Sequence, residues 1–191
     1  MKNNRYGQAK VLTTPELDLV IDNLPSIFHK TIALTLRNTG ARVGEVVQLK
    51  WRDIGEDSIL FPATIVKRKL KSREIFISNE FRNELMNWKD YWASYKGRKP
   101  LPEDYIFYGR FNGSHITERT FQSALESGLK ASSIKGGSVH SFRRTQLSSL
   151  HKKGVPLKVI QSLSGHQSLS TLSLYLEVDD ADKRKAIAHL A

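Results

Sequence analysis

Apolar residues recur at the spacing of an α-helix over most of this chain, and they alternate with polar residues in a single short stretch. Helical spacing first predicts a helix over residues 14–23, with Thr14 as its N-cap. A second run, residues 27–39, is apolar on more than one face, which predicts a buried central helix that ends near Gly40. The same spacing continues over residues 43–51.

The pattern changes after Asp57. Residues 58–61 and 64–66 are short apolar runs, and residues 74–78 alternate apolar and polar side chains, as strands do. These three segments predict a small antiparallel sheet with a hairpin turn before its last strand. Residues 105–108 are a further candidate strand.

Helical spacing returns after this sheet and continues to the end of the chain. The predicted helices cover residues 79–95, 116–131, 139–152, 156–164, 168–176 and 179–190. The expected fold is therefore mainly α with a small antiparallel β-sheet (α+β), in one domain over residues 11–191 after a leader or linker remnant over residues 1–10. No apolar run approaches the roughly 18 residues that cross a bilayer, so we expect no membrane partner.

Charge gives the first indication of function. Thirty Lys and Arg residues against 19 Asp and Glu give a formal charge of +11, which favours a polyanionic partner, nucleic acid first. A basic surface that only maintains solubility is the alternative. The chain has no cysteine, which fits a reducing cytosol, and it lacks a phosphate-binding loop, a dinucleotide fingerprint and the HExxH and GxSxG motifs. Its six histidines show no metal-ligand spacing, so we expect neither a metal nor a cofactor.

Two motifs in the first half of the chain could meet a phosphate. In the first, Arg42 follows the predicted helix end at Gly40, and Glu45 lies three residues further on, close enough to orient its guanidinium. In the second, residues 67–73 (KRKLKSR) place five cations in seven residues at the predicted hairpin tip, where they would face a docked polyanion. A surface ion pair and a solvated turn are the simpler interpretations of these motifs.

Two further motifs lie in the second half of the chain. His140 and Arg143 are three residues apart on a predicted helix, so an imidazole and a guanidinium can grip the same phosphate. Gly165 ends one predicted helix, His166 stands at the entry to the next, and Tyr175 follows nine residues later. Taken singly, the first spacing is more often incidental, and a tyrosine in an apolar helix is more often part of a core.

Together and in this order, the four motifs resemble the catalytic domain of the tyrosine recombinases, the phage integrase family. The usual pattern of that family is close to TGxRxxExxxLxWxDI, then a hairpin lysine, HxxRHxxAT and LGHxxxxxTxxxY. The resemblance covers roughly residues 11–180. Two departures stand out, because Arg144 occupies the position of a common histidine and Ser164 splits the Leu-Gly-His sequence.

The resemblance also concerns the start of the chain. Family members usually carry a separate N-terminal helical domain that completes a clamp around DNA, whereas only about ten residues precede the first predicted helix here. We therefore expect either a fragment of a longer protein or a short member with a catalytic domain alone, such as the fimbrial switch recombinases.

The resemblance implies a set of catalytic residues, with Tyr175 as the nucleophile that forms a 3′-phosphotyrosyl linkage. Arg42 and Arg143 would hold the non-bridging phosphate oxygens, and His166 would donate a further hydrogen bond. His140 would support proton movement at the nucleophile. A hairpin lysine would serve as the general acid.

The identity of that lysine is the least decided point. The family interval counted back from Arg73 lands on Arg68, which holds its proton too tightly to be a good donor. Lys67 and Lys69 share the other face of a strand by its two-residue period. We favour Lys69, which needs a hairpin shortened by one residue, and keep Lys67 as the alternative. The cations expected to contact DNA without a catalytic role are Lys67, Arg68, Lys71, Arg73 and Arg144.

The activity that the resemblance implies is site-specific recombination of double-stranded DNA, by integration, excision or inversion. It further implies a homo-oligomer, a tetramer on DNA, with accessory DNA-bending proteins as further partners and a cytoplasmic, nucleoid-associated location. Two other functions stay open: a DNA-binding regulator that does not cut, and a relaxase like the type IB topoisomerases. Residues 179–190 carry a small apolar stripe, and we expect this helix to dock onto a neighbouring protomer, with folding back onto its own chain as the alternative.

Overall fold

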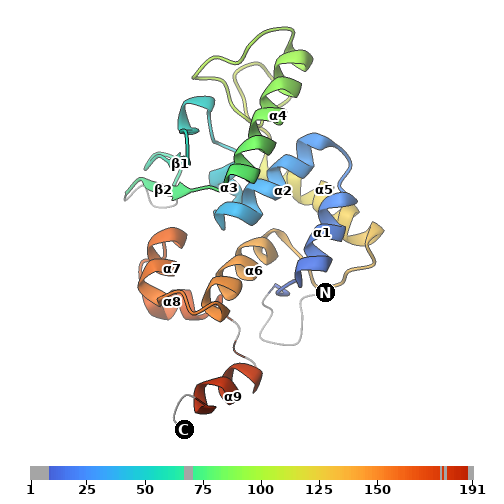
Figure 1. The fold of residues 1–191 in the computed structure, drawn as a ribbon. Helices are drawn as coiled ribbons and strands as arrows, with labels where there is room; N and C mark the ends of the chain where they lie inside the picture. Colours follow the sequence, from blue (N-terminus) through green and yellow to red (C-terminus); the bar gives the residue numbers. More distant parts are fainter. Residues whose placement is uncertain (1–8, 67–70, 177, 179, 189–191) are drawn as a thin grey trace.

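The computed structural model describes residues 9–66, 71–176, 178 and 180–188 (Figure 1). Helices make up most of this part of the chain, and one two-stranded antiparallel sheet accompanies them, which confirms the predicted fold class. The helices are α1 (Thr14–Asp22), α2 (Ile27–Thr39), α3 (Val43–Val46), α4 (Asn79–Lys96), α5 (Glu118–Ala131), α6 (Val139–Lys152), α7 (Leu157–Ser164), α8 (Leu169–Ser173) and α9 (Asp180–Ala188), with one 3₁₀ turn, η1 (Trp51–Asp53), and the strands are β1 (Ser58–Phe61) and β2 (Arg73–Phe76).

The N-cap of helix α1 lies one residue earlier than predicted, because it is Thr13 and not Thr14. The Thr13 hydroxyl accepts a hydrogen bond from the amide of Glu16 at 3.3 Å, and the Glu16 carboxylate accepts one from the amide of Thr13 at 2.9 Å. This reciprocal capping box satisfies two backbone donors that the first helical turn leaves without partners.

The sheet is smaller than predicted. Strands β1 and β2 pair antiparallel from Ser58 opposite Phe76 to Phe61 opposite Arg73. The predicted strand over residues 64–66 is wrong: the Pro62 carbonyl accepts hydrogen bonds from two amides three and four residues later, which closes a turn. The apolar side chains of that turn pack against the core without joining the ladder.

Two other segments also differ from their predicted elements. The helix predicted over residues 43–51 stops after α3, because Lys50 leaves the helical path to form an isolated bridge with Tyr105, and its amide donates to Asp53 at 2.9 Å. Residues 105–108 consequently form isolated bridges instead of a strand, the second of them between Tyr108 and His115.

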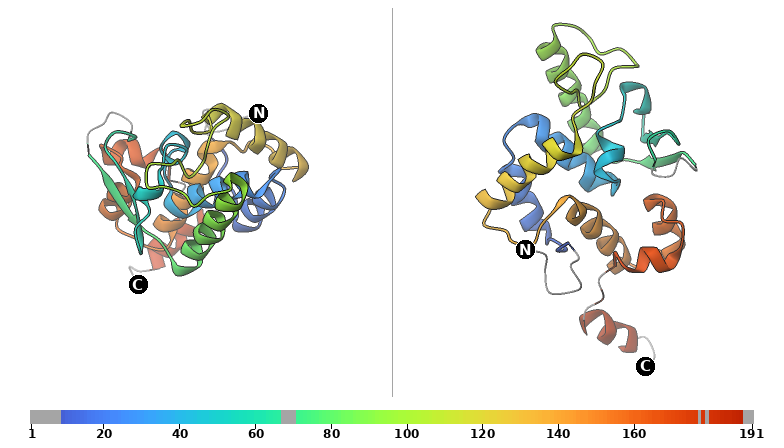
Figure 2. Two further views of the ribbon diagram at one scale, coloured as in Figure 1. Left: turned by 90° about the horizontal axis from the view of Figure 1, so that it is seen from above. Right: turned by 180° about the vertical axis from the view of Figure 1, so that it is seen from behind.

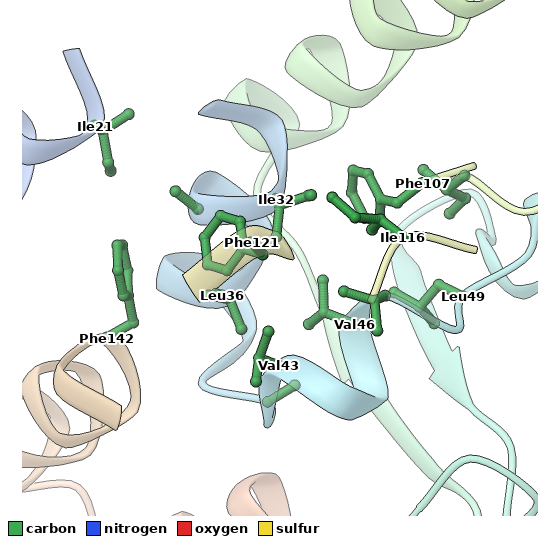
Figure 3. Close-up of a cluster of buried hydrophobic side chains, with 14 of the residues drawn as sticks. Ile21, Ile32, Leu36, Val43, Val46, Leu49, Phe107, Ile116, Phe121 and Phe142 are labelled. Atoms are coloured by element: carbon green, nitrogen blue, oxygen red, sulfur yellow. The ribbon is translucent and has the colours of Figure 1, made fainter. Parts of the chain in front are cut away.

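The main hydrophobic core is built around α2, as its apolar faces predict. Figure 3 shows side chains from α2, α3, α5 and α6 meeting there with residues from the loops, among them Ile32, Leu36, Val46, Phe121 and Phe142. Leu147 of α6 belongs to a second, small cluster with Ile160 and Leu172 from α7 and α8. The core thus fixes α6, while the second cluster attaches α7 and α8 to the far side of that helix.

Two side views show how these parts are stacked (Figures 1 and 2). Helix α4 lies at one end of the molecule, α2 and α3 lie in the middle with the sheet beside α3, and α6, α7 and α8 form a layer below them. Helix α9 lies beyond this layer, apart from the other helices, in both side views. No helix in the described ranges is long and apolar enough to cross a membrane.

Candidate active site

Arg143 of α6 is the centre of the candidate site, and the protein holds it between two helix ends. Its side chain is buried, with 1% of its surface exposed. Nη1 donates to the Gly40 carbonyl at 2.7 Å, and Nη2 donates to the Ser164 carbonyl at 2.6 Å. Gly40 follows α2 and Ser164 ends α7, so the guanidinium faces the negative ends of two helix dipoles. Two backbone carbonyls therefore accept the hydrogen bonds of this buried charge, and the nearby Glu45 carboxylate also favours it.

Two glycines make this arrangement sterically feasible. Gly40 has a φ of +59° and Gly165 a φ of +67°, values that non-glycine residues rarely adopt. A Cβ atom at Gly40 would lie 1.8 Å from the Oε1 atom of Gln146, and one at Gly165 would lie 2.5 Å from the Nη1 atom of Arg73. The glycines of the first and last motifs therefore serve the same purpose, which is to end a helix against a polar side chain.

His166 is nearly buried beside this guanidinium, with 5% of its surface exposed. Its Nδ1 atom lies 2.7 Å from the Ser164 hydroxyl oxygen, and its ring centroid lies 4.7 Å from that of Tyr175. Burial first, and then the charges of Arg143 and its neighbours, lower the pKa of His166 to about 3. The imidazole is neutral at physiological pH, and it can donate a hydrogen bond but carries no charge.

The surroundings of Arg143 also make its charged form less favourable than it is in water. Burial and the nearby positive charge of Arg42 lower the pKa of the Arg143 guanidinium to about 9. It therefore remains protonated at neutral pH, although its surroundings disfavour the charge. An anion bound in front of it would relieve that strain, which is the electrostatic condition expected of a phosphate site.

Arg42 and Glu45 form the predicted pair, and Arg73 joins them. Arg42 Nη1 lies 3.1 Å from Glu45 Oε1, and Arg73 Nη2 lies 2.7 Å from Glu45 Oε2. Burial alone would raise the pKa of the Glu45 carboxyl, but Arg73, the Arg42 amide and the Arg42 guanidinium together lower it below its ordinary value. The expectation that Arg73 presents its charge to DNA is wrong, because its side chain is buried in this ion pair.

Arg42 and Glu45 line one cleft of about 710 Å³ together with Arg143, His166, His140 and Tyr175. The cleft brings together five of the six predicted catalytic residues: Arg42, His140, Arg143, His166 and Tyr175. His140 is exposed on the same face of α6 as Arg143, and the guanidinium carbon of Arg143 lies 5.6 Å from the centre of the Tyr175 ring. The described residues contain no group of three or more potential metal ligands among His, Cys, Asp and Glu.

The predicted hairpin cations are only partly described. Lys67, Arg68 and Lys69 lie outside the described residues. Lys71 is exposed, as expected of a residue that contacts DNA. Arg144 is partly buried, and its Nη1 atom donates a hydrogen bond to the Ala9 carbonyl, so this nitrogen is engaged within the protein.

Sequence reasoning missed five polar residues of the cleft, among them Gln167 and Thr171 next to the predicted His166 and Tyr175. Gln48, Glu118 and Gln122 line it as well, and the last two come from the first turns of α5. No motif connects α5 with the other residues of the site, so only the fold brings them there. Ser164 was visible in the sequence as a departure from the family pattern, and its contact with His166 gives that departure a structural role.

Residues 10–182 match the model of the phage integrase family. The chain belongs to this family. Its curated relatives include a tyrosine recombinase of Pseudothermotoga lettingae, 29% identical over 181 residues that cover 87% of this chain and 59% of the relative. Tyrosine recombinase XerC of Staphylococcus saprophyticus is 31% identical over 157 residues, which cover 82% of this chain and 51% of the relative. This phage integrase domain thus spans little more than half the length of these relatives.

Solved structures of recombinases have the same fold as this phage integrase domain. The XerA recombinase superimposes with a TM-score of 0.78 at 22% identity, covering 98% of this chain and 65% of that one. The XerH site-specific recombinase in a post-cleavage complex with its difH substrate gives a TM-score of 0.77 at 21% identity, covering 98% and 55%. The resemblance inferred from the four motifs is therefore confirmed at the level of family and fold.

Proposed function

We propose that this protein is a tyrosine-type site-specific recombinase that cuts and rejoins double-stranded DNA through Tyr175. One observation carries the proposal: the Tyr175 ring lies 4.7 Å from the His166 ring and 5.6 Å from the Arg143 guanidinium, in a cleft that Arg42 also lines. A phenol held beside two guanidinium groups and a neutral imidazole suits attack on a phosphodiester, because charge grows on the phosphate oxygens during that attack.

In the proposed first step, the Tyr175 oxygen attacks the scissile phosphorus and loses its proton. The bond between phosphorus and the 5′ oxygen breaks, and the departing oxygen takes up a proton to become a 5′ hydroxyl. The new phosphotyrosyl ester keeps the energy of the broken bond. Attack on that ester by the 5′ hydroxyl of a second strand reverses the step, restores the DNA backbone and returns a proton to the tyrosine.

Each cleft residue has a proposed role in this step that follows from its charge and its exposure. Arg143, fixed between two helix ends, would neutralise one non-bridging oxygen, and Arg42, whose side chain is 27% exposed at the rim, would neutralise the other. His166 is neutral, so it would contribute a hydrogen bond and no charge. His140, exposed beside them on α6, would take the proton that Tyr175 releases.

The proton for the departing 5′ oxygen would come from a hairpin lysine. Our candidate remains Lys69, with Lys67 as the alternative, on the family interval and the two-residue period of a strand. Strand β2, which follows this segment, shows such a period in its own residues, since 73 and 75 are buried while 74 and 76 are exposed.

Double-stranded DNA is the proposed partner. Its support is the formal charge of +11, the exposed Lys71, and fold neighbours whose structures hold DNA, such as XerH and the Tn1549 transposon integrase. We further propose a tetramer on DNA, with accessory DNA-bending proteins and a nucleoid location. The position of α9 apart from the other helices, with Ile187 exposed on it, supports docking of this helix onto a neighbouring copy.

A covalent trapping experiment tests the activity. The probe is a library of nicked duplexes with a randomised central sequence, in which cleavage next to the nick releases a short 5′-hydroxyl fragment that diffuses away. A protein that cleaves through tyrosine remains attached to DNA in denaturing detergent, and sequencing of the attached strands yields a preferred duplex. We expect an adduct with the parental chain and none with Tyr175→Phe, while both proteins bind the enriched duplex with similar affinity.

The other functions give different results in the same experiment. A regulator that only binds DNA would show affinity for duplex and no adduct with the parental chain. A relaxase would form the adduct and relax a supercoiled plasmid, but it would not exchange strands between two copies of the enriched site on one plasmid. An adduct that persists in Tyr175→Phe would refute the assignment of the nucleophile.

A further inference from the structure

Arg73 is a buried cation at the first position of β2. Only 7% of its side-chain surface is exposed, and its guanidinium carbon lies 5.0 Å from the centre of the Phe61 ring on the paired strand. Its Nη2 atom donates to Glu45 Oε2 at 2.7 Å. A residue in this position cannot contact a DNA phosphate directly, although it stands two residues after the exposed Lys71.

Glu45 is shared between Arg73 and Arg42. Its carboxylate is 2% exposed; Oε1 accepts from the Arg42 guanidinium at 3.1 Å, and Oε2 accepts from the Arg42 amide at 3.0 Å as well as from Arg73. Only one terminal nitrogen of Arg42 is thereby paired with Glu45. The shared carboxylate links the start of β2 to a catalytic candidate 31 residues earlier in the chain.

Removal of Arg73 would change how Glu45 pairs with the Arg42 guanidinium. A carboxylate forms stronger pairs with a guanidinium through two bonds than through one, and Oε2 can take the second bond while it still accepts from the Arg42 amide. Without Arg73, Oε2 would lose its charged partner, and the buried carboxylate would draw the Arg42 guanidinium toward itself. Arg42 would then offer fewer N–H groups to a phosphate, with its charge offset by the carboxylate.

Arg73 also contacts the segment that leads into His166. Its Nη1 atom lies where a Cβ atom of residue 165 would be 2.5 Å away, so only glycine permits this approach. Arg73 therefore lies between Glu45 and the end of α7, and its charge contributes to the lowered pKa of His166. The motif that contains Glu45 and the motif that contains Gly165 therefore both contact the side chain of Arg73, which belongs to neither motif.

We propose that Arg73 is a positioning residue for DNA cleavage. By occupying Glu45 Oε2, it limits Glu45 to a single bond with the Arg42 guanidinium and keeps the remaining N–H groups of Arg42 available to the scissile phosphate. This inference rests on the proposed recombinase activity. It assigns Arg73 an effect on the rate of cleavage and not on DNA affinity.

A mutant cycle tests the coupling on the enriched suicide duplex at saturating protein. We expect Arg73→Met to slow covalent adduct formation by about 10- to 100-fold and Arg42→Ala by about 10²- to 10³-fold, the usual range for loss of a group that stabilises the transition-state charge. The double variant should be no slower than Arg42→Ala, because Arg73 acts through Arg42. Arg73→Lys should recover part of the rate.

A neutral substrate separates this role from a general loss of structure. In a duplex whose scissile phosphate is replaced by a methylphosphonate, one charged oxygen is missing, so the reaction needs less neutralisation by Arg42. The deficits of Arg42→Ala and Arg73→Met, each relative to the parental chain, should both shrink on this substrate. A merely destabilised protein would show the same deficit on both substrates. Lys130→Met is the matched control, because Lys130 is an exposed cation in the last turn of α5 that does not line the cleft, and its loss should leave the saturated rate unchanged.

Several results would overturn the inference. A folded Arg73→Met protein that cleaves at the parental rate would overturn it. A double variant would also overturn it if its rate fell below that of Arg42→Ala by the same factor by which Arg73→Met falls below the parental chain. Thermal melts establish folding, and Arg73→Gln, which keeps a hydrogen-bond donor, enters the same cycle if the Met variant does not fold. Failure of the proposed function looks different, because the parental chain itself would then form no adduct.

Discussion

The imidazole of His166 lies 4.7 Å from the ring of Tyr175, centroid to centroid, with the two planes tilted by 50°. The backbone carbonyl of Tyr175 is fixed as well, since it accepts a hydrogen bond from the Ser148 hydroxyl of α6 at 3.1 Å. The helix that carries His140 and Arg143 thus also anchors the proposed nucleophile. The position of the tyrosine relative to the phosphate-binding groups is consequently set by contacts inside a single copy of the chain.

Ser164 is predicted to set the tautomer of His166. Its hydroxyl lies 2.7 Å from His166 Nδ1 and 3.3 Å from the Gln161 carbonyl, so donation to Nδ1 is the shorter option. Arg143 Nη2 is 3.4 Å from Nδ1 and 3.3 Å from Nε2, so it lies against the ring and is aligned with neither nitrogen. With Nδ1 accepting, the neutral ring carries its hydrogen on Nε2, where it can donate to a phosphate oxygen.

The test is Ser164→Ala, which should slow covalent adduct formation by about 5- to 10-fold, corresponding to one hydrogen bond of ~1 kcal/mol. Nitrogen chemical shifts of His166 should change from a ring protonated at Nε2 to a mixture of tautomers. Ser162→Ala is the control, because Ser162 is exposed on the same helix and bonds only its local backbone among the described contacts. An unchanged tautomer in Ser164→Ala would refute the assignment.

The low pKa of His166 predicts how stability depends on pH. The folded pKa is about 3 and the unfolded one about 6.5, so between these values the unfolded chain binds a proton that the folded chain does not. This contribution to stability is complete above pH 6.5 and is lost as the pH falls. The free energy of unfolding should therefore decrease on acidification, by up to ~1.4 kcal/mol per pH unit from this one residue.

Urea unfolding of the parental chain and of His166→Gln between pH 5 and 7 measures this effect. The variant should have the shallower slope of the two. His29, whose pKa burial also lowers, is present in both proteins and cancels in the comparison. Glu45, whose pKa is lowered, titrates below this window, and Arg143 stays charged throughout it. Equal slopes would show that His166 is not held neutral by its surroundings.

The motif spacing identified five residues that line one cleft, because the motifs lie at helix ends. Gly40 and Gly165 terminate helices, and the residues next to them have little freedom once the helices pack. Arg73 could not be placed in the same way. In the sequence it is the last cation of a basic run, and nothing in that run distinguishes it from Lys71; its buried partner, Glu45, is 28 residues away. Long-range ion pairs of this kind leave no local pattern.

Arg144 is predicted to stabilise the fold without contributing to DNA binding. Its guanidinium donates to the Ala9 carbonyl, and the neighbouring Thr145 hydroxyl accepts from the Leu12 amide at 2.9 Å, so residues 9–12 are attached to α6. Arg144→Met should lower the free energy of unfolding by ~1.5 kcal/mol, the range for a hydrogen bond to a charged group.

Salt titrations of DNA affinity test whether Arg144, unlike Lys71, makes no contact with a DNA phosphate. Each phosphate contact contributes about 0.9 to the slope of log K against log salt concentration. The slope of Arg144→Met should equal that of the parental chain, whereas the exposed Lys71, when changed to Gln, should reduce it by about one contact. A reduced slope for Arg144→Met would return Arg144 to the DNA-binding surface.

The general acid is the last prediction, and a sulfur substitution decides it. In a duplex whose scissile 5′ oxygen is replaced by sulfur, the departing thiolate needs little protonation, so a variant that lacks only the general acid cleaves it at close to the parental rate. We expect Lys69→Ala to be slow on ordinary DNA and to recover on this substrate. Tyr175→Phe should stay inactive on both, because sulfur does not replace the nucleophile. If Lys67→Ala recovers and Lys69→Ala cuts ordinary DNA at the parental rate, the acid is Lys67, two positions earlier in the sequence.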